Sequence, residues 1–105
     1  MTEIRTIYVG RKRVHVYVAA VLNAMQAGER EIELVARGNA IRTAIDAAEI
    51  CRRRNGHIAG LLPEEMKNKG IEIGTEEIEM DDHTRTLSYI KIHLEGVGDL
   101  PSEDE

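Results

Sequence analysis

Two basic clusters have the residue types of a phosphate-binding site, and each stands where an apolar run ends. The first reads "GRKR" (residues 10–13) and the second reads "ARGNAIR" (residues 36–42). Guanidinium and ammonium groups form charge-assisted hydrogen bonds with phosphate oxygens. The clusters therefore supply these candidate phosphate contacts: Arg11, Lys12, Arg13, Arg37 and Arg42.

The sequence gives little support for other chemistry. The histidines show no metal-ligand spacing, and the single cysteine, Cys51, lies at a helical apolar position typical of a core residue. Asp81, Asp82 and His83 could form a metal or acid–base site, but a polar hairpin turn explains them more simply. We find no nucleophile–base pair, no P-loop and no dinucleotide-binding glycine pattern. We therefore expect no catalytic site, metal, cofactor or small-molecule substrate.

Periodicity predicts the elements that hold the two clusters. Residues 4–9 and 31–36 have the composition and alternation of strands. A helix follows each strand, because apolar residues then recur at helical spacing and each run ends near a glycine. Asn39 is the expected N-cap of the second helix. The apolar positions are Val14, Val18, Val21, Leu22 and Met25 in the first helix and Ile41, Ala44, Ile45, Ala48 and Cys51 in the second.

The rest of the chain indicates a loop and a β-hairpin. We expect a loop over residues 56–70 with one helical turn from Pro63, then strands over residues 71–80 and 85–94. The apolar positions of the first of these strands change parity across Gly74, which predicts a bulge there. The last strand has one face for the core and one for a dimer interface: Ile90, Ile92 and Leu94 form the first, and Leu87 and Tyr89 form the second.

The order β-α-β-α-β-β predicts a single α/β (α+β) domain with a mixed four-stranded sheet and two helices. A strand–helix–strand unit of this length makes a parallel pair with a right-handed crossover. Both strand-to-helix junctions then lie at one edge of the sheet. The tip of the hairpin, residues 81–85, reaches the same edge if the third strand is parallel to the first two. Helix N-termini add free N–H groups there, so we expect a phosphate-binding surface.

Charge and composition narrow the possibilities further. The 105 residues carry a formal net charge of -5, with +4 in residues 1–60 and -9 in residues 61–105. Residues 95–105 contain acids but no cation, so we expect an acidic flexible tail after a domain of residues 1–94. We see no membrane-spanning apolar run and no secretion signal, and the lone cysteine favours the cytoplasm.

Three stretches together resemble the Alba family of archaeal chromatin-associated proteins. They read "YVGRKRVHVYVAAVLNAM", "VARGNAIRTAIDAAEICRRR" and "IEIGTEEIE", in this order and at matching spacing. The resemblance covers about residues 4–94. It implies a β-α-β-α-β-β fold like that of the C-terminal domain of translation initiation factor 3. It also implies a homodimer that binds double-stranded DNA with little sequence preference, and often RNA.

The resemblance assigns roles to particular residues. Arg11 and Lys12 match the family's basic pair, and Arg37 matches its junction arginine. Residues 80–86 match one of two arms that reach along the minor groove, while Asn55 stands near a position where some members use phenylalanine for dimer–dimer contacts. Together with the edge geometry, this gives the candidate nucleic-acid contacts Arg11, Lys12, Arg13, Arg37, Asn39, Arg42 and Arg85.

Our interpretation is a dimeric protein without enzymatic activity that is associated with the chromosome and holds nucleic acid by its phosphates. One alternative is a form of this function that prefers RNA or a few DNA sites, since the charge is low and Asp81 and Asp82 lie in the arm. A second alternative, from another class, is a protein-interaction module that uses the acidic strand and tail.

Overall fold

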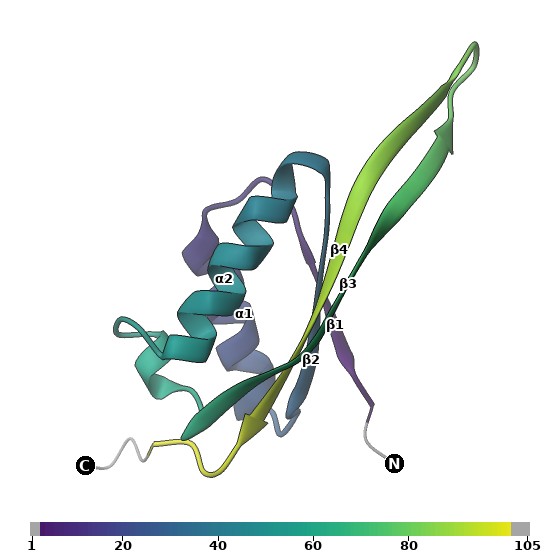
Figure 1. Cartoon of the computed structure of the whole chain (residues 1–105). Helices are drawn as coiled ribbons and strands as arrows, with labels where there is room; N and C mark the ends of the chain where they lie inside the picture. The colour runs from purple at the N-terminus through teal and green to yellow at the C-terminus, as the bar shows by residue number, and fades with distance from the viewer. Residues whose placement is uncertain (1–2, 102–105) are drawn as a thin grey trace.

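Four strands form one sheet, and both helices pack on the same face of it (Figure 1). The computed structural model describes residues 3–101. The predicted order of elements is confirmed, with two added turns of 3₁₀ helix. In chain order the elements are β1 (Arg5–Val9), α1 (Val14–Gln26), β2 (Glu31–Arg37), η1 (Gly38–Ala40), α2 (Ile41–Arg53), η2 (Ala59–Leu61), β3 (Glu65–Glu79) and β4 (Thr84–Val97).

The sheet is mixed, as predicted, and its strands lie in the order β1-β2-β4-β3. β1 is parallel to β2, whereas β4 is antiparallel to both of its neighbours. β1, β2 and β3 therefore run in the same direction. As a result, the β1–α1 junction, the β2–α2 junction and the β3–β4 turn lie toward the same end of the sheet (Figure 1).

The core lies between the helices and one face of the sheet. The expected alternation is confirmed, because Ile90, Ile92 and Leu94 are at most 4% exposed. α1 contributes Val18, Val21, Leu22 and Met25, and β2 contributes Ile32 and Leu34. Full burial of a side chain of this size stabilises the fold by about 1.5–3 kcal/mol.

α2 presents small side chains to the core. Ala44, Ala47, Ala48 and Cys51 are at most 4% exposed, which lets α2 approach α1 closely. Ile45, which the periodicity assigned to this face, is 43% exposed instead. Both helices have 13 residues, and no helix within residues 3–101 has the length and apolar character that crossing a bilayer requires.

The start of α2 differs from the prediction. Asn39 is not the N-cap, because residues 38–40 form the 3₁₀ turn η1 and Ala40 takes the capping position without a side-chain hydrogen bond. Gly38 has a φ of +55°, so the chain turns one residue before Asn39. This turn moves the cap one residue beyond Asn39, to Ala40, and leaves the Asn39 side chain free for other contacts.

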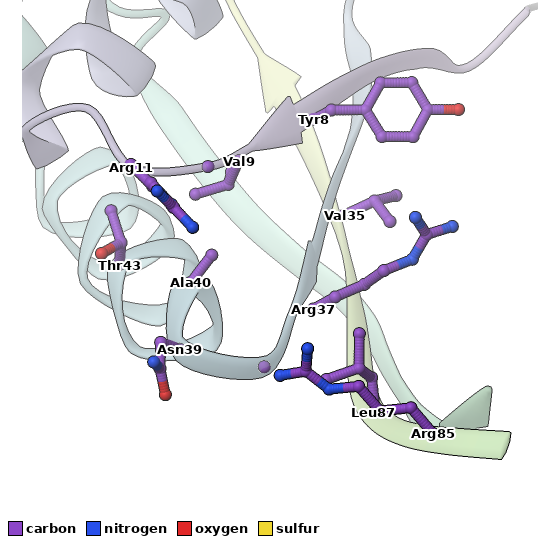
Figure 2. A pocket seen from close by; sticks show the side chains of 12 residues that line it. Tyr8, Val9, Arg11, Val35, Arg37, Asn39, Ala40, Thr43, Arg85 and Leu87 are labelled. Carbon is purple, nitrogen blue, oxygen red and sulfur yellow. The ribbon is translucent and has the colours of Figure 1, made fainter. Parts of the chain in front are cut away.

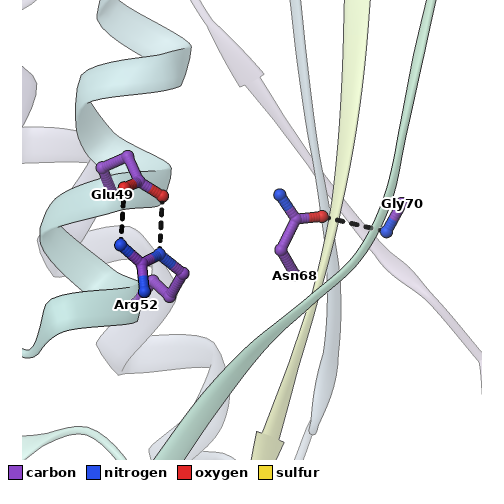
Figure 3. Close-up of polar contacts among 4 residues, drawn as sticks. All are labelled: Glu49, Arg52, Asn68 and Gly70. Carbon is purple, nitrogen blue, oxygen red and sulfur yellow. Dashed lines mark hydrogen bonds and ion pairs between the residues drawn. The ribbon is translucent and has the colours of Figure 1, made fainter.

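The hairpin is longer than expected. β3 begins at Glu65, so the predicted loop of residues 56–70 is too long, and the helical turn precedes Pro63 rather than starting there. The bulge lies between Asn68 and Gly70, where the Asn68 Oδ1 accepts a hydrogen bond from the Gly70 N–H at 2.9 Å (Figure 3). Gly74 pairs regularly with Tyr89, so the bulge predicted there is wrong.

The role of Gly74 is to make room for an aromatic ring. A Cβ atom at this position would lie 2.5 Å from the ring of Tyr89. The apolar positions of β3 change parity across Gly74 for a reason other than a bulge. Ile71 and Ile73 are 57% and 75% exposed at the free edge of the sheet, so they do not mark a buried face.

The C-terminal boundary of the fold also differs. β4 continues to Val97, the Gly96 N–H donates to the Arg30 carbonyl oxygen at 2.8 Å, and Leu100 packs against the core. The boundary predicted after residue 94 therefore falls inside a strand. The last acids of the predicted tail, Glu103, Asp104 and Glu105, lie outside the described residues.

Candidate nucleic-acid interface

A groove of about 660 Å³ opens where β1 and β2 end, and we call it the junction groove (Figure 2). Five parts of the chain build it: the end of β1 and its following loop, β2, η1, the first turn of α2, and β4. It contains three arginines, and none of the described residues that line it is acidic. The lining residues are Tyr8, Val9, Gly10, Arg11, Val35, Arg37, Gly38, Asn39, Ala40, Thr43, Arg85 and Leu87.

A buried tyrosine fixes the first basic cluster. Tyr17, on α1, is 6% exposed, and its hydroxyl oxygen accepts hydrogen bonds from the N–H groups of Gly10 at 2.8 Å and Lys12 at 3.1 Å. The loop backbone is therefore anchored to the helix, while the side chains of Arg11 and Lys12 remain exposed. Preorganised cations lose less conformational entropy when they bind phosphate.

The junction arginine has an acidic partner. Arg37 closes β2, and its Nε lies 2.9 Å from the Glu76 Oε2 on β3. Both side chains are partly exposed, so this ion pair adds little stability, about 0–1 kcal/mol. It nevertheless sets the position of the Arg37 guanidinium and competes with any phosphate that approaches it.

The structure brings four of the seven predicted contacts into one groove: Arg11, Arg37, Asn39 and Arg85. Lys12 lines a neighbouring hollow beside Arg11 and Tyr17. Arg13 is exposed just before α1. Arg42 lies apart from the groove and is not among its lining residues. Its Nε lies 3.9 Å from the Asp46 carboxylate, and its side chain is 91% exposed.

Three side chains with a hydroxyl group help to build the site and were not predicted as site residues: Tyr8, Tyr17 and Thr43. Thr43 is half-buried in the first turn of α2 and lines the groove. Tyr8 is 73% exposed on the sheet face opposite the helices. The alternation of residues 4–9 already places Tyr8 on the face opposite Ile7 and Val9, which was the available signal.

The hairpin extends beyond the helices and forms an arm (Figure 1). At its tip the Met80 N–H donates to the His83 carbonyl oxygen at 2.8 Å, and the His83 Nδ1 lies 2.6 Å from the Asp82 Oδ1. Residues 79–86 are all exposed. Within that range Arg85 is the one cation, so the arm combines a basic root with an acidic tip.

The residues predicted for a dimer interface already have contacts within the chain. Leu87 is half-buried in the junction groove. The Tyr89 hydroxyl donates to the Glu72 Oε2 at 3.0 Å, and this hydrogen bond raises the pKa of Tyr89, because it stabilises the protonated phenol. Lys91 Nζ lies 5.8 Å from the centre of the Tyr89 ring, within reach of a cation–π interaction.

Cys51 is a packing residue in this structure. Burial raises the pKa of its thiol from 9.0 to about 12, so it carries no thiolate near neutral pH. In residues 3–101 we find no group of three or more histidine, cysteine, aspartate or glutamate side chains arranged to hold a metal.

Comparison with known proteins connects this arrangement to one family. The family model described as Alba matches residues 5–62. DNA/RNA-binding protein Alba 1 of Archaeoglobus fulgidus is 40% identical over 89 residues, which cover 85% of this chain and 92% of that protein. DNA/RNA-binding protein Alba of Methanothrix thermoacetophila is 35% identical over 94 residues, 90% of this chain and 98% of that one. Alba from Thermoplasma volcanium superposes with a TM-score of 0.72 at 31% identity, covering 87% of this chain and 99% of that structure.

Proposed function

Because the chain belongs to the Alba family, we propose that it binds nucleic acid through phosphates, with the junction groove and the adjacent Lys12 as the contact surface. One observation carries this proposal: Arg11, Arg37 and Arg85, from three separate parts of the chain, line a single groove in which no described lining residue is acidic. The names of the relatives support it, since both are called DNA/RNA-binding proteins.

The proposed binding is by charge and shape, without catalysis. Cations that contact phosphates release counterions, so affinity falls with salt by about 0.9 in log affinity per log salt for each contact on B-DNA. Such contacts do not read the sequence. The net charge of -5 does not oppose this locally, because charges beyond about 10 Å are screened at 0.1 M salt. We place this activity in the cytoplasm, on the chromosome.

We also propose that the protein acts as a homodimer, which would present two grooves and two arms to one nucleic acid. Leu87 and Tyr89 remain the predicted interface. The exposed apolar residues favour a second face: Ile71 and Ile73 on the free edge of β3, with Ile45 on α2, which packs beside β3. A long exposed edge strand that carries such side chains tends to pair with another chain.

Light scattering of single variants separates these two faces. The unaltered protein should have about twice the chain mass of 11.8 kDa. Ile73→Lys should yield a monomer if the edge of β3 is the interface, and Tyr89→Ser should do so if the predicted face is. A monomeric unaltered protein would contradict the dimer altogether.

Gel shifts on duplex DNA and duplex RNA at two salt concentrations test the binding itself. Arg11→Glu combined with Lys12→Glu should abolish most of the binding, because both exposed cations stand on the anchored loop. Arg53→Glu combined with Lys67→Glu is the matched control, since both side chains are exposed and neither lines the junction groove. Equal losses in the two double variants would contradict the proposed surface, and no binding by any form at low salt would favour the protein-interaction alternative.

A further inference from the structure

Tyr8 is an aromatic side chain that contributes little to the fold. It is 73% exposed, and its hydroxyl has no hydrogen-bond partner among residues 3–101. The other tyrosines differ, because the hydroxyl of Tyr17 accepts two backbone hydrogen bonds and that of Tyr89 donates to Glu72. Exposing an apolar ring to water is unfavourable, so the exposed ring of Tyr8 does not serve to stabilise the fold.

The surroundings of Tyr8 match one class of ligand. Tyr8 is the register partner of Val35 on β2, and Arg37 lies two residues further along the same strand. All three therefore project from the sheet face opposite the helices, as Figure 2 shows. An aromatic ring, an apolar floor and a guanidinium plane together form the surface on which an unpaired nucleobase stacks.

The ion pair of Arg37 with Glu76 fits this role. The carboxylate engages the Nε edge of the guanidinium at 2.9 Å and neutralises part of its charge. The flat faces of the guanidinium remain available, and stacking uses those faces. Arg37 held in this way presents a flat face to a base while its remaining charge still faces the groove.

Arg11 and Arg85 complete the site. Both line the junction groove, and neither forms an ion pair within the described residues. Their guanidinium groups are therefore available for the phosphates of a strand that enters the groove. In a duplex the faces of the bases are covered by their neighbours, so only an unpaired nucleotide can use the whole groove.

We infer that Tyr8 and Arg37 form a stacking platform for an unpaired nucleobase and that Arg11 and Arg85 bind its flanking phosphates. The groove would therefore prefer single-stranded or bulged nucleic acid over a perfect duplex. This inference rests on the proposed function and names the strand state that the same groove selects. RNA and single-stranded DNA share the required chemistry.

Substitutions at Tyr8 test the platform. Tyr8→Leu removes the ring and keeps an apolar side chain, whereas Tyr8→Phe keeps the ring and removes the hydroxyl. Stacking one base on an aromatic side chain corresponds to about 5- to 150-fold in affinity. Tyr8→Leu should therefore weaken the binding of short single-stranded RNA and DNA by that factor and weaken duplex binding less, while Tyr8→Phe should bind like the unaltered protein.

A spectroscopic probe reports the stacking directly. A short strand that contains 2-aminopurine should lose fluorescence on binding the unaltered protein or Tyr8→Phe, and should keep it on binding Tyr8→Leu at saturation. If Tyr8→Leu loses affinity for RNA alone, the ligand of the platform is RNA. If it loses affinity for both RNA and single-stranded DNA, the ligand is any unpaired strand. Either result supports the platform.

Other outcomes overturn it. Single-strand affinity that Tyr8→Leu does not change excludes stacking on this ring, and so does an equal loss on duplex and single strand. A changed oligomer mass of Tyr8→Leu would assign the ring to an interface between copies. If charge reversal of Arg11 and Lys12 still abolishes duplex binding in those cases, the proposed function stands and only the platform fails.

Discussion

At the scale of single residues, the Tyr17 hydroxyl holds the backbone on which Arg11 and Lys12 stand. Tyr17→Phe should lower stability by about 1–3 kcal/mol, because it removes two hydrogen bonds that each contribute about 0.5–1.5 kcal/mol. It should also weaken nucleic-acid binding, because the loop would have to be ordered on binding. Urea denaturation and a gel shift measure the two effects, with Tyr89→Phe as the control that removes a different hydroxyl. Unchanged binding by Tyr17→Phe would show that the anchor does not matter.

Glu76 is the residue that limits the charge of Arg37. Glu76→Gln should raise affinity for duplex DNA and steepen the salt dependence by up to about 0.9, because a freed arginine can take one more phosphate. Glu79→Gln removes the same charge from the same strand at an exposed position and serves as the control. Equal gains in the two variants would mean that overall charge, rather than the ion pair, is responsible.

At the scale of elements, β3 and β4 depend on the fit between Gly74 and the ring of Tyr89. Gly74→Ala should destabilise the protein by about 1–3 kcal/mol, because a Cβ atom 2.5 Å from the ring forces the ring or the strands to move. Gly60→Ala is the control, since a Cβ atom there meets nothing within 4 Å. Urea denaturation midpoints give both values, and equal midpoints would show that the ring moves aside freely.

The packing of α2 predicts a dependence on alkaline pH. Because burial raises the pKa of Cys51 from 9.0 to about 12, the folded chain holds this proton to higher pH than the unfolded chain. The stabilising contribution is complete below pH 9 and is lost as pH rises from 9 toward 12, at about 1.4 kcal/mol per pH unit.

Comparison with Cys51→Ala isolates this group from the tyrosines and lysines that titrate in the same range. The difference in free energy of unfolding between the two proteins should shrink from pH 8 to pH 10.5 when measured in urea. A difference that stays constant with pH would contradict a buried, protonated thiol.

The elements themselves were predictable to different degrees. β1, α1, β2 and α2 follow from periodicity, because their buried residues recur at the spacing of a strand or a helix. The first half of β3 gives no such signal, since Met66 is its one buried residue between Glu65 and Gly70. An edge strand is held by its hydrogen bonds to β4, and that pairing leaves little trace in side-chain pattern.

At the scale of the whole molecule, the meeting of the two junctions and the arm root was predictable from topology alone. A parallel β1–β2 pair and a parallel β3 leave no other arrangement. The sequence could not predict which residues line the groove, because this depends on the direction of each side chain and on its local partners. Arg42 turns toward Asp46, and Tyr8 enters the site from β1, a strand whose prediction assigned Tyr8 no role in binding.

Part of the acidic charge lies far from the junction groove. The chain extends 59 Å along its longest axis, and its described C-terminus lies at the end opposite the arm (Figure 1). Asp99 therefore leaves the fold far from the junctions that carry Arg11 and Arg37. The acids near the C-terminus are thus separated from the basic groove, whereas Glu76, Asp81 and Asp82 lie at the groove's own end.

An NMR titration of the ¹⁵N-labelled protein with a short nucleic acid locates the binding surface residue by residue. We predict that the amide signals of residues 8–12, 37–43 and 85–87 shift together as the ligand is added, because these segments surround the junction groove. Signals at the other end, around residues 28–30 and 59–62, should stay in place. Shifts confined to that other end, or to the acidic strand β3, would contradict the account.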